Sequence, residues 1–582
     1  MEKSPVPLLI GWLCLGVGLL SGGTQAEPAD LVLRSGKILT LDTAQPEVQA
    51  LAARNGAIVA LGSNADVERF VGSTTQVIDL NGQLAIPGFI EGHGHFPGIG
   101  ENKMNLDLMG TKSWDEIVQM VAQAVEKAKP GQWIIGRGWH QEKWTSTPQP
   151  SVEGFPTHES LDKVSPNNPV ILTHASGHAS FANQKALELS GVTSQTRNPD
   201  GGEILKDANG KPTGLLRETA SRLIKRGTGE PTPTAEEREA RHRRVLELAD
   251  REVISKGITS FQDAGSTFDG AGALELVNDT KRMIDDGKMH VRMWIMIREY
   301  NPETLAANRV IGYGNNMMTV RAIKITADGA LGSRGAWLLE PYSDLPESSV
   351  PVSTSRVGLP SVSMDAVRGR AQIAIEQGYQ MCIHAIGDRA NREVLNIYEE
   401  TFKRNLKNGH ALRWRIEHAQ HLNPADIPRF GQLGVIASMQ GVHCTSDAPW
   451  VIPRLGARRA EEGAYVWQKL MKSGAIVTNG TDAPVEDVDP IASYYSSVTR
   501  KAADGKVFFG DQKMSRMEAL RSYTQANAFA AFEEDIKGTL ARGKLADITV
   551  LTKDITTIPD DQIKSAKVAY TIIGGKVVYK AN

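Results

Sequence analysis

A three-part pattern recurs through the middle of this chain: a charged, amphipathic segment, then a glycine, then a short apolar run that ends in an acidic or imidazole side chain. Such runs cover residues 258–263, 379–384 and 475–482, which follow Gly257, Gly378 and Gly474. A glycine just beyond a helix end is the usual left-handed cap, and a short β-branched run indicates a buried parallel strand. The pattern therefore predicts alternating helices and parallel strands whose ends carry polar side chains.

Periodicity places the helices of this alternation. It predicts amphipathic helices over residues 364–376 and 391–403 and a long, charged helix over residues 235–256. Between about residue 257 and residue 490, helices and strands alternate regularly. Alternation of this kind with polar strand ends favours an α/β fold, specifically a (β/α)8 TIM-type barrel. We assign the barrel to residues 86–532.

Both ends of the chain are instead rich in short strands separated by glycine turns. The predicted strands cover residues 31–33, 37–40 and 57–61 near the start, and 547–551, 568–573 and 576–579 near the end. We expect residues 27–85 and 533–582 to meet in one small composite β-sandwich domain.

Residues 103–250 depart from the regular alternation, because proline, glycine and asparagine cluster within them. We interpret this segment as an insertion, partly of β structure, that lies near the barrel mouth. Its glycine-punctuated stretch 136–144 carries Trp139 and Trp144 and reads as a loop. These two indoles either line an apolar substrate pocket or anchor the insertion to the barrel, and the sequence leaves both alternatives open.

The first 26 residues have the features of a secretory signal peptide. Lys3 supplies a positive charge, residues 6–20 are almost entirely apolar, and small residues precede a cleavage site after Ala26. The apolar stretch is short for a spanning helix, which needs about 20 residues, although an uncleaved anchor is the alternative. We expect an exported protein, periplasmic or secreted, with no stable membrane insertion after cleavage.

Composition narrows the range of partners. The 582 residues carry a formal net charge of −2, which gives no electrostatic basis for binding nucleic acid. Only Cys382 and Cys444 remain after removal of the leader, so we expect no disulfide framework and favour buried thiols over metal ligands. The sequence leaves the oligomeric state open, with a homodimer among the alternatives.

Side chains that can bind a metal lie at the ends of successive predicted strands. They are His93, His95, Lys324, His384, His418 and Asp482. Each alone is compatible with a structural role: an ion pair of Lys324 with Asp328, a satisfied core imidazole, or a turn at Asp482. The strand ends of a barrel converge on one face, however, and His93 and His95 alternate on a strand and so share a face. Imidazole together with carboxylate suits zinc or a similar first-row metal.

The motifs around these residues resemble the amidohydrolase superfamily, in the amidohydrolase-3 branch that includes N-substituted formamide deformylases. The resemblance extends to the terminal segments 29–33 and 543–547 and implies a metal-dependent hydrolase. It rests on Ile-Pro-Gly-Phe-Ile-Glu-Gly-His-Gly-His at 86–95, Asp-Gly-Ala-Leu-Gly-Ser at 328–333, His-Ala-Ile-Gly-Asp at 384–388, Ile-Glu-His at 416–418 and Thr-Asp-Ala-Pro at 481–484.

The resemblance also implies a division of the metal ligands. In it, His93, His95 and Asp482 hold a first ion, and His384 and His418 hold a second. Carboxylated Lys324 would bridge the two, which is chemically reasonable because a buried, neutral amine can react with carbon dioxide. The number of ions, one or two, stays open.

We expect a hydrolase that cleaves a non-peptide carbon–nitrogen bond of a small molecule, an amide or an N-formyl group, with water activated by the metal. Asp482 would accept the proton of that water and deliver it to the leaving nitrogen. His178 and His443 are candidate donors to the developing oxyanion, with solvent-facing loop positions as their alternative.

Two other functions remain as alternatives. One is a deaminase or cyclic-imide hydrolase on the same metal site, which a small, polar pocket would favour. The other is a non-catalytic regulatory or binding protein, which predicts an incomplete ligand set. Neither a phosphate-binding glycine loop nor a serine-hydrolase elbow is present in the sequence.

Overall fold

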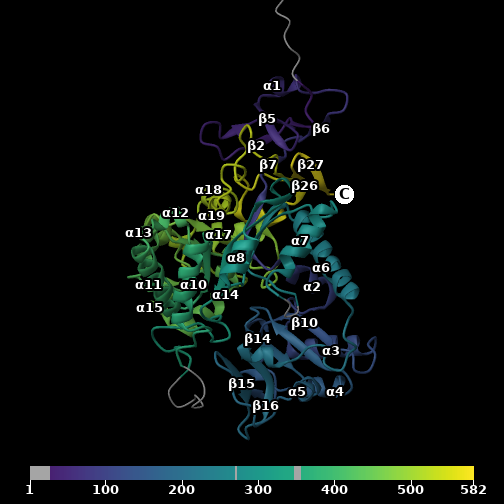
Figure 1. The fold of residues 1–582 in the computed structure, drawn as a ribbon, viewed down its shortest axis with the longest axis vertical. Coiled ribbons are helices and arrows are strands. Elements are labelled where there is room, and N and C mark those ends of the chain that lie inside the picture. The colour runs from purple at the N-terminus through teal and green to yellow at the C-terminus, as the bar shows by residue number, and fades with distance from the viewer. Residues whose placement is uncertain (1–26, 269–271, 346–355, 582) are drawn as a thin grey trace, which may run out of the picture.

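The computed structural model describes residues 27–268, 272–345 and 356–581, so the signal peptide predicted over residues 1–26 lies outside the described residues. Three layers follow one another along the long axis of the molecule (Figure 1). Strands from both chain ends form the top layer, a barrel of helices and strands the middle, and residues of the predicted insertion the bottom.

The middle layer is a TIM-type barrel, as the sequence predicts. Its strands run parallel from β8 to β24 and end at one face. Between the first and last strands, Gly92 N donates to Asn479 O at 3.2 Å and Asp482 N to His93 O at 2.8 Å, which nearly closes the barrel. The strands are β8 (Phe89–Gly94), β17 (Ile258–Asp263), β18 (Arg292–Ile297), β20 (Met318–Thr326), β21 (Gln380–Ala385), β22 (Arg415–His418), β23 (Ile436–Ser438) and β24 (Val477–Thr478).

Helices cover the outside of these strands and bury their apolar faces against them. The predicted helices are confirmed as α6 (Ala235–Ser255), α10 (Met364–Gln377) and α11 (Asp388–Arg404). Gly257 and Gly378 follow α6 and α10 with φ of 80° and 67°, the left-handed region in which glycine alone avoids a steric penalty. No helix in the described part of the chain is long and apolar enough to cross a membrane.

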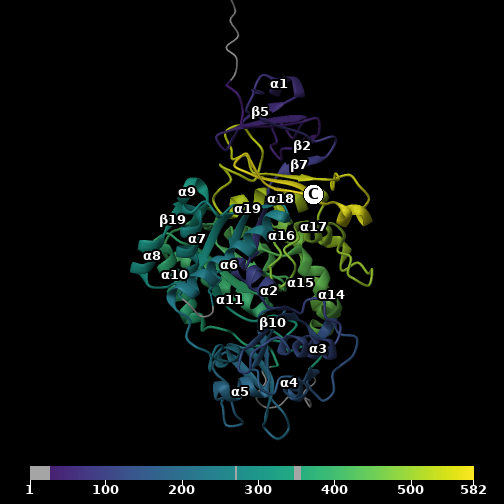
Figure 2. The ribbon, with the colours of Figure 1, turned by 90° about the vertical axis from the view of Figure 1, so that its right-hand side faces the viewer.

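The two chain ends lie side by side above the barrel, as the purple and yellow strands of Figures 1 and 2 show. A six-stranded sheet joins both ends, because β7 (Leu84–Pro87) pairs antiparallel with β25 (Ile548–Leu551). The sheet continues through β26 (Val568–Ile573) and β27 (Lys576–Lys580). A four-stranded sheet, β5 (Ala57–Gly62), β4 (Ala50–Arg54), β1 (Leu31–Arg34) and β6 (Gln76–Asp79), completes this layer.

A buried ion pair ties the barrel to this upper layer. The guanidinium of Arg292, the first residue of β18, donates to both carboxylate oxygens of Asp547 at 2.7 and 3.0 Å. Both side chains are 4% exposed. The pair therefore sits at the amino-terminal end of the barrel strands.

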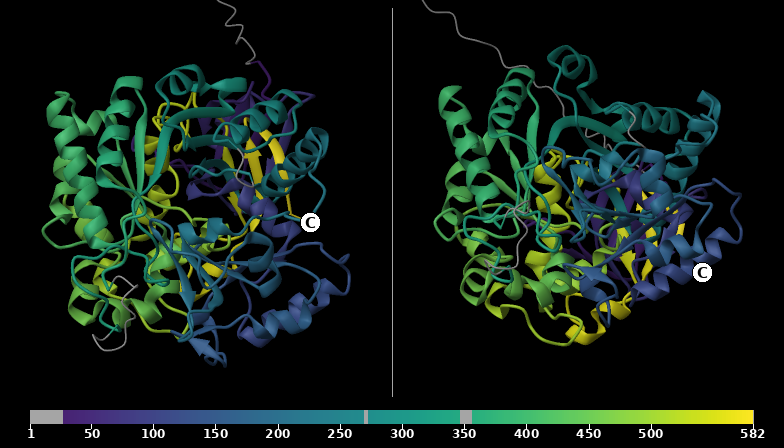
Figure 3. Two further views of the ribbon diagram at one scale, coloured as in Figure 1. Left: turned by 60° about the horizontal axis from the view of Figure 1, so that its bottom comes forward. Right: turned by 90° about the horizontal axis from the view of Figure 1, so that it is seen from below.

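The bottom layer interrupts the barrel between β8 and β17. Its core is a mixed sheet that spans residues 106–218. The strand order is β15 (Gly202–Lys206), β16 (Pro212–Glu218), β14 (Ala179–Ala182), β13 (Val170–His174), β10 (Ile134–Trp139) and β9 (Leu106–Asp107). Most of α6 falls within the predicted insertion of residues 103–250, but the helix packs on the barrel, against α2 (Phe96–Met104) and β17. Seen from below, this layer overlaps part of the barrel end (Figure 3).

The glycines beside Trp139 suggest a loop, but Trp139 ends the inner strand β10 (Ile134–Trp139). Its side chain is fully buried in the core of the insertion, and its indole N–H donates to Leu172 O. Position 138 requires glycine, because a Cβ there would lie only 2.5 Å from Met109 Cγ. The indole therefore packs within the insertion and does not line a substrate pocket.

Candidate metal centre

The structure brings the six predicted metal-binding side chains together at the carboxyl ends of the barrel strands. His93, Lys324, His384 and His418 lie on β8, β20, β21 and β22, and Asp482 follows β24. All of these are buried, whereas the His95 side chain is 30% exposed. Residues that are hundreds of positions apart in the sequence therefore share one small volume.

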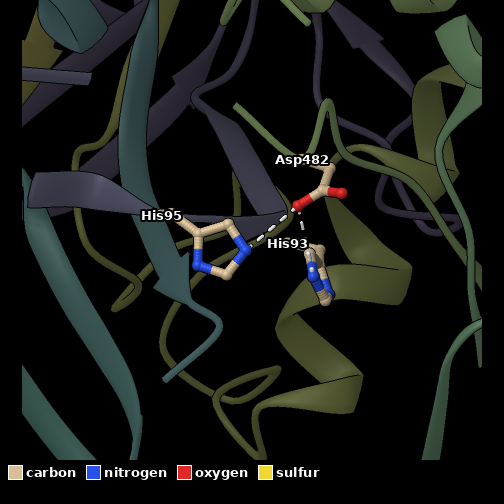
Figure 4. A group of neighbouring side chains, drawn as sticks. All are labelled: His93, His95 and Asp482. Carbon is tan, nitrogen blue, oxygen red and sulfur yellow. Dashed lines mark ion pairs between the residues drawn. The ribbon is translucent and has the colours of Figure 1, made fainter. Parts of the chain in front are cut away.

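One group consists of His93, His95 and Asp482, whose ligand atoms lie within 4.8 Å of one another. Nε2 of His93 lies 3.5 Å and Nε2 of His95 3.3 Å from the same Asp482 carboxylate oxygen, Oδ1. Figure 4 shows both rings turned toward that oxygen. This is the ligand set that the family resemblance implies for the first ion.

A second group combines Asp482 with His418 and His443 within the same 4.8 Å limit. The ring centroids of His418 and His93 are 4.7 Å apart, and those of His418 and His384 are 4.4 Å apart. His384 and Lys324 are neighbours of these groups but not members of either. Lys324 Nζ lies 3.4 Å from His93 Nε2.

In His93, His95 and His418, the other ring nitrogen lies beside a hydrogen-bond acceptor. Nδ1 of His418 lies 2.9 Å from Gln440 Oε1, and Nδ1 of His93 contacts the Glu417 carboxylate. Nδ1 of His95 lies 3.2 Å from the hydroxyl of Ser266, which itself donates to Asp263. These acceptors keep the proton on Nδ1, so Nε2 of each neutral ring presents a lone pair to the centre.

Glu417 belongs to a fully buried polar network behind His93. Arg415 Nη2 donates to Glu417 Oε2 at 3.0 Å, and the Nε of the same guanidinium lies 2.7 Å from Glu417 Oε1 as an ion pair. The same guanidinium contacts Gln262 Oε1 at 2.5 Å, Gly92 O at 2.8 Å and Ser438 Oγ at 2.7 Å. Burial would raise the pKa of Glu417, but Arg415 and His93 hold it well below its usual range, so the carboxylate stays ionised.

Asp482 has strained backbone geometry, with a φ of 58°, which few non-glycine residues adopt. Burial alone would raise the pKa of its carboxyl group, yet the imidazoles of His95, His93 and His418 lower the pKa well below its ordinary value. The Asp482 side chain is therefore an anion in the middle of the histidine cluster.

Lys324 is 2% exposed, and burial together with the nearby Arg298 cation lowers its pKa to about 8. Its alternative role as an ion-pair partner of Asp328 is wrong. The Asp328 carboxylate instead accepts the backbone N–H groups of Ile386, Gly387 and Trp337 at 2.8 to 2.9 Å.

The donor set fits a divalent cation. His384 Nε2 and Asp482 Oδ1 are buried and make no hydrogen bond within the described residues. Buried polar atoms without partners are costly, and neutral imidazoles with a carboxylate are the usual protein ligands of zinc and its neighbours.

The centre opens into a cavity between the barrel and the insertion. His384, His418, His443 and Asp482 lie on its barrel side, and His178 faces them from the insertion. An apolar part of the wall consists of Leu331, Ile386, Trp450 and Val485. The cavity therefore has a polar, metal-binding side and a partly apolar surface that can contact an organic group.

The two candidate oxyanion donors, His443 and His178, differ in which ring nitrogen carries the proton of the neutral imidazole. The amide nitrogen of Gln420 lies 3.1 Å from His443 Nδ1 and can only donate, so His443 carries its proton on Nε2. His178 Nδ1 instead lies 2.7 Å from the carboxylate of Glu218. Its proton is therefore on Nδ1 when the ring is neutral.

Several residues of the site were not assigned from the sequence. Arg415 and Glu417 could have been identified from the sequence, because two charged residues two positions apart in a buried strand point to the same side. No sequence pattern identifies Gln420, Gln440 or Glu218, since their partners come from distant segments. Trp450 reaches the cavity from α14 (Gly441–Leu455).

Comparisons with known proteins show which proteins this chain resembles. A model of the Amidohydrolase family matches residues 76–579. Protein LONG AFTER FAR-RED 3 of Arabidopsis thaliana is 34% identical, over 95% of this chain and 92% of its own length. Putative amidohydrolase YtcJ of Bacillus subtilis is 32% identical (94% and 99%), and N-substituted formamide deformylase of Arthrobacter pascens is 25% identical (95% and 98%).

A solved structure also matches over most of its length. An uncharacterized metal-dependent hydrolase from Pyrococcus furiosus superposes with a TM-score of 0.67 and is 25% identical. The match covers 90% of this chain and all of the other.

Proposed function

Because this chain belongs to the amidohydrolase family and is a metal-dependent hydrolase, we propose that it hydrolyses a non-peptide carbon–nitrogen bond, in an amide or an N-formyl group of a small molecule. The observation that carries the proposal is the convergence of His93 and His95 on Asp482, whose side chain lines a cavity with a partly apolar wall. The similarity to an N-substituted formamide deformylase supports the bond type.

His93, His95 and Asp482 would hold one ion, and His384 and His418 would hold a second. We propose zinc as the resident metal, since imidazole and carboxylate ligands suit it. When bound, such a cation polarises a carbonyl oxygen and makes water a stronger nucleophile at neutral pH.

Asp482 is the residue best placed to move a proton. Its carboxylate is ionised and faces the cavity, so it can accept a proton from the attacking water. His443 Nε2–H has no hydrogen-bond partner among the described residues and can donate to the negative oxygen that develops on the substrate.

The cavity wall favours an uncharged organic substituent on the substrate. Leu331, Ile386, Trp450 and Val485 offer apolar contact, which supports an aryl or alkyl amide over a small polar heterocycle. Deamination and cyclic-imide opening would need the same ligands, so a substrate panel separates them. The filled ligand set argues against a purely regulatory or binding protein.

The test combines metal analysis with that panel. Purified protein is expected to contain one or two equivalents of metal and to cleave formamides or aryl amides faster than cyclic imides or aminated heterocycles. Asp482→Asn is expected to lower kcat by about 10²- to 10⁴-fold, with Asp547→Asn as a buried-carboxylate control. Near-normal turnover by Asp482→Asn, or cleavage of cyclic imides alone, would overturn the proposal.

We also propose that the mature protein is exported, to the periplasm or beyond. The support is the charged start, the apolar residues 6–20 and the small residues before Ala26. Mass spectrometry of the protein from cell fractions tests this. A full-length chain confined to the cytosolic fraction would refute it.

A further inference from the structure

One face of helix α14 forms a wall of the cavity that leads away from the metal-binding side chains. His443, Asp447 and Trp450 stand at positions i, i+4 and i+7 of this helix, which share a face, and all three border the cavity. Asp447 therefore lies about one helical turn, or about 6 Å, beyond His443, and Trp450 lies about two turns beyond it. A substrate that extends from the centre along this wall meets a carboxylate and then an indole.

Only one oxygen of the Asp447 carboxylate is used within the protein. Its Oδ2 accepts a hydrogen bond from the hydroxyl of Tyr465 at 2.6 Å, and the Tyr465 side chain is fully buried. Oδ1 has no hydrogen-bond partner in the part of the chain that the structure describes, and it is not among the enclosed polar atoms without partners. Tyr465 therefore fixes the carboxylate and leaves Oδ1 available to a ligand in the cavity.

The charges beside Asp447 suit an uncharged hydrogen-bond donor. Glu486 and Lys143 border the same cavity and form an ion pair with a separation of 4.0 Å. The Lys143 ammonium opposes the entry of a second cation, so this part of the wall does not select a cation as an isolated carboxylate would. Burial raises the pKa of the Asp447 carboxyl group to about 6. The group is thus still ionised at neutral pH and is a strong acceptor.

Trp450 supplies apolar contact next to this carboxylate. The residue is 3% exposed, and its ring packs against that of His140 from the insertion, with centroids 4.6 Å apart and an angle of 32° between the planes. Leu331 and Val485 extend the apolar surface. An aromatic ring of the substrate can therefore pack on this surface while a polar group on that ring meets Asp447.

We propose that Asp447 determines substrate specificity by accepting a hydrogen bond from an uncharged donor, a hydroxyl or an amide N–H, on the N-substituent of the substrate. The substrate class is then a formamide or amide of an amine that carries an aryl group with such a donor. This inference rests on the proposed function, because it concerns the same cavity. No bond is made or broken at Asp447, so its role is to select and orient the substrate.

The experiment compares three N-benzylformamides that carry a hydroxymethyl, a methoxy or an ethyl group on the ring. These groups are nearly equal in size, but only hydroxymethyl donates a hydrogen bond, methoxy only accepts one and ethyl does neither. Each is made as the meta and the para isomer. The metal-loaded wild type is expected to show a kcat/KM about 10- to 100-fold higher for one hydroxymethyl isomer than for its methoxy and ethyl counterparts.

Asp447→Asn keeps the size of the side chain and removes its charge. It is expected to reduce the preference for the hydroxymethyl compound to less than about fivefold, since a neutral hydrogen bond contributes less than one to a charged group. Tyr465→Phe is the matched control, because it breaks the same Tyr465–Asp447 bond but leaves the carboxylate in place. It is expected to lose stability and to keep the preference. Metal content and thermal midpoint are measured on both variants.

The outcomes separate this inference from the proposed function. If the wild type cleaves no formamide and no other amide, the proposed function fails and the role of Asp447 fails with it. If the wild type cleaves all three compounds at similar rates or prefers the methoxy compound, only the role of Asp447 is refuted, and this result needs no variant. The role is also refuted if Asp447→Asn retains the preference, or if Tyr465→Phe loses as much of it as Asp447→Asn does.

Discussion

Replacing Glu417 by glutamine tests the idea that the carboxylate behind His93 supports metal binding. The substitution keeps the size of the side chain and an oxygen that can face His93 Nδ1. It removes the negative charge that orients this ring and that balances the buried guanidinium of Arg415. We therefore expect two separate effects, one on metal affinity and one on stability.

The expected magnitudes follow from the contacts. Partners that hold the second nitrogen of a metal-binding imidazole change metal affinity by about 10- to 100-fold, which equals about 1.4 to 2.8 kcal/mol of binding free energy. Breaking a buried ion pair costs about 3 to 5 kcal/mol of folding stability. Arg415 keeps Gln262, Gly92 and Ser438 as partners, so we expect the lower end of that range.

Metal affinity is measured by competition with a chelator of graded concentration, and stability by denaturant unfolding of the metal-free protein. Asp547→Asn is the matched control, since Asp547 also pairs with a buried arginine, at the far end of the barrel strands. It is expected to lose stability without losing metal affinity. Equal metal affinity in Glu417→Gln and the wild type, or an equal loss in the control, would refute the reasoning.

Three further predictions concern metal removal, the thiols and pH. Chelation is expected to abolish turnover and to lower stability by about 2.7 kcal/mol relative to metal at a hundred times its Kd; metal-free protein with unchanged stability and turnover would contradict this. Burial raises the pKa of the Cys382 thiol, and it raises that of the Cys444 thiol to about 11. Neither thiol is therefore expected to react with Ellman's reagent before denaturation. Prompt labelling of the folded protein would contradict this prediction. The hydrogen bond to Asp250 raises the pKa of His290, so the stabilisation by this pair is full below about pH 6.5 and is lost as pH rises through the higher folded-state pKa. The stability difference between the wild type and His290→Gln should therefore shrink between pH 6 and pH 9, and a difference that grows would be incompatible with the pairing.

The sequence predicts the barrel well because its signals are local. The apolar run 258–263 after Gly257 is β17 to the residue, and helix periodicity places α10 within one residue at its end. The convergence of His93, His95 and Asp482 follows from barrel geometry alone, since strand ends meet at one face.

What the sequence does not predict depends on tertiary contacts. The run 475–482 contains only a two-residue strand, β24, because the chain then turns toward β8 through the strained Asp482. The glycines in 136–144 suggest a loop. Gly138 instead lies in the inner strand β10, where the absence of a side chain leaves room for Met109. The protonation of His443 depends on Gln420, and that of His178 on Glu218, and no spacing rule joins these pairs.

The pairing of β7 with β25 also constrains when the molecule can be completed. Phe89 N and Thr549 Oγ1 meet at this junction although they are 460 positions apart. At about 5 to 20 residues per second, a ribosome needs roughly 20 to 90 seconds to synthesise the intervening chain. Throughout that interval the early strand has no partner on this edge, so the upper sheet is assembled only after translation has almost finished.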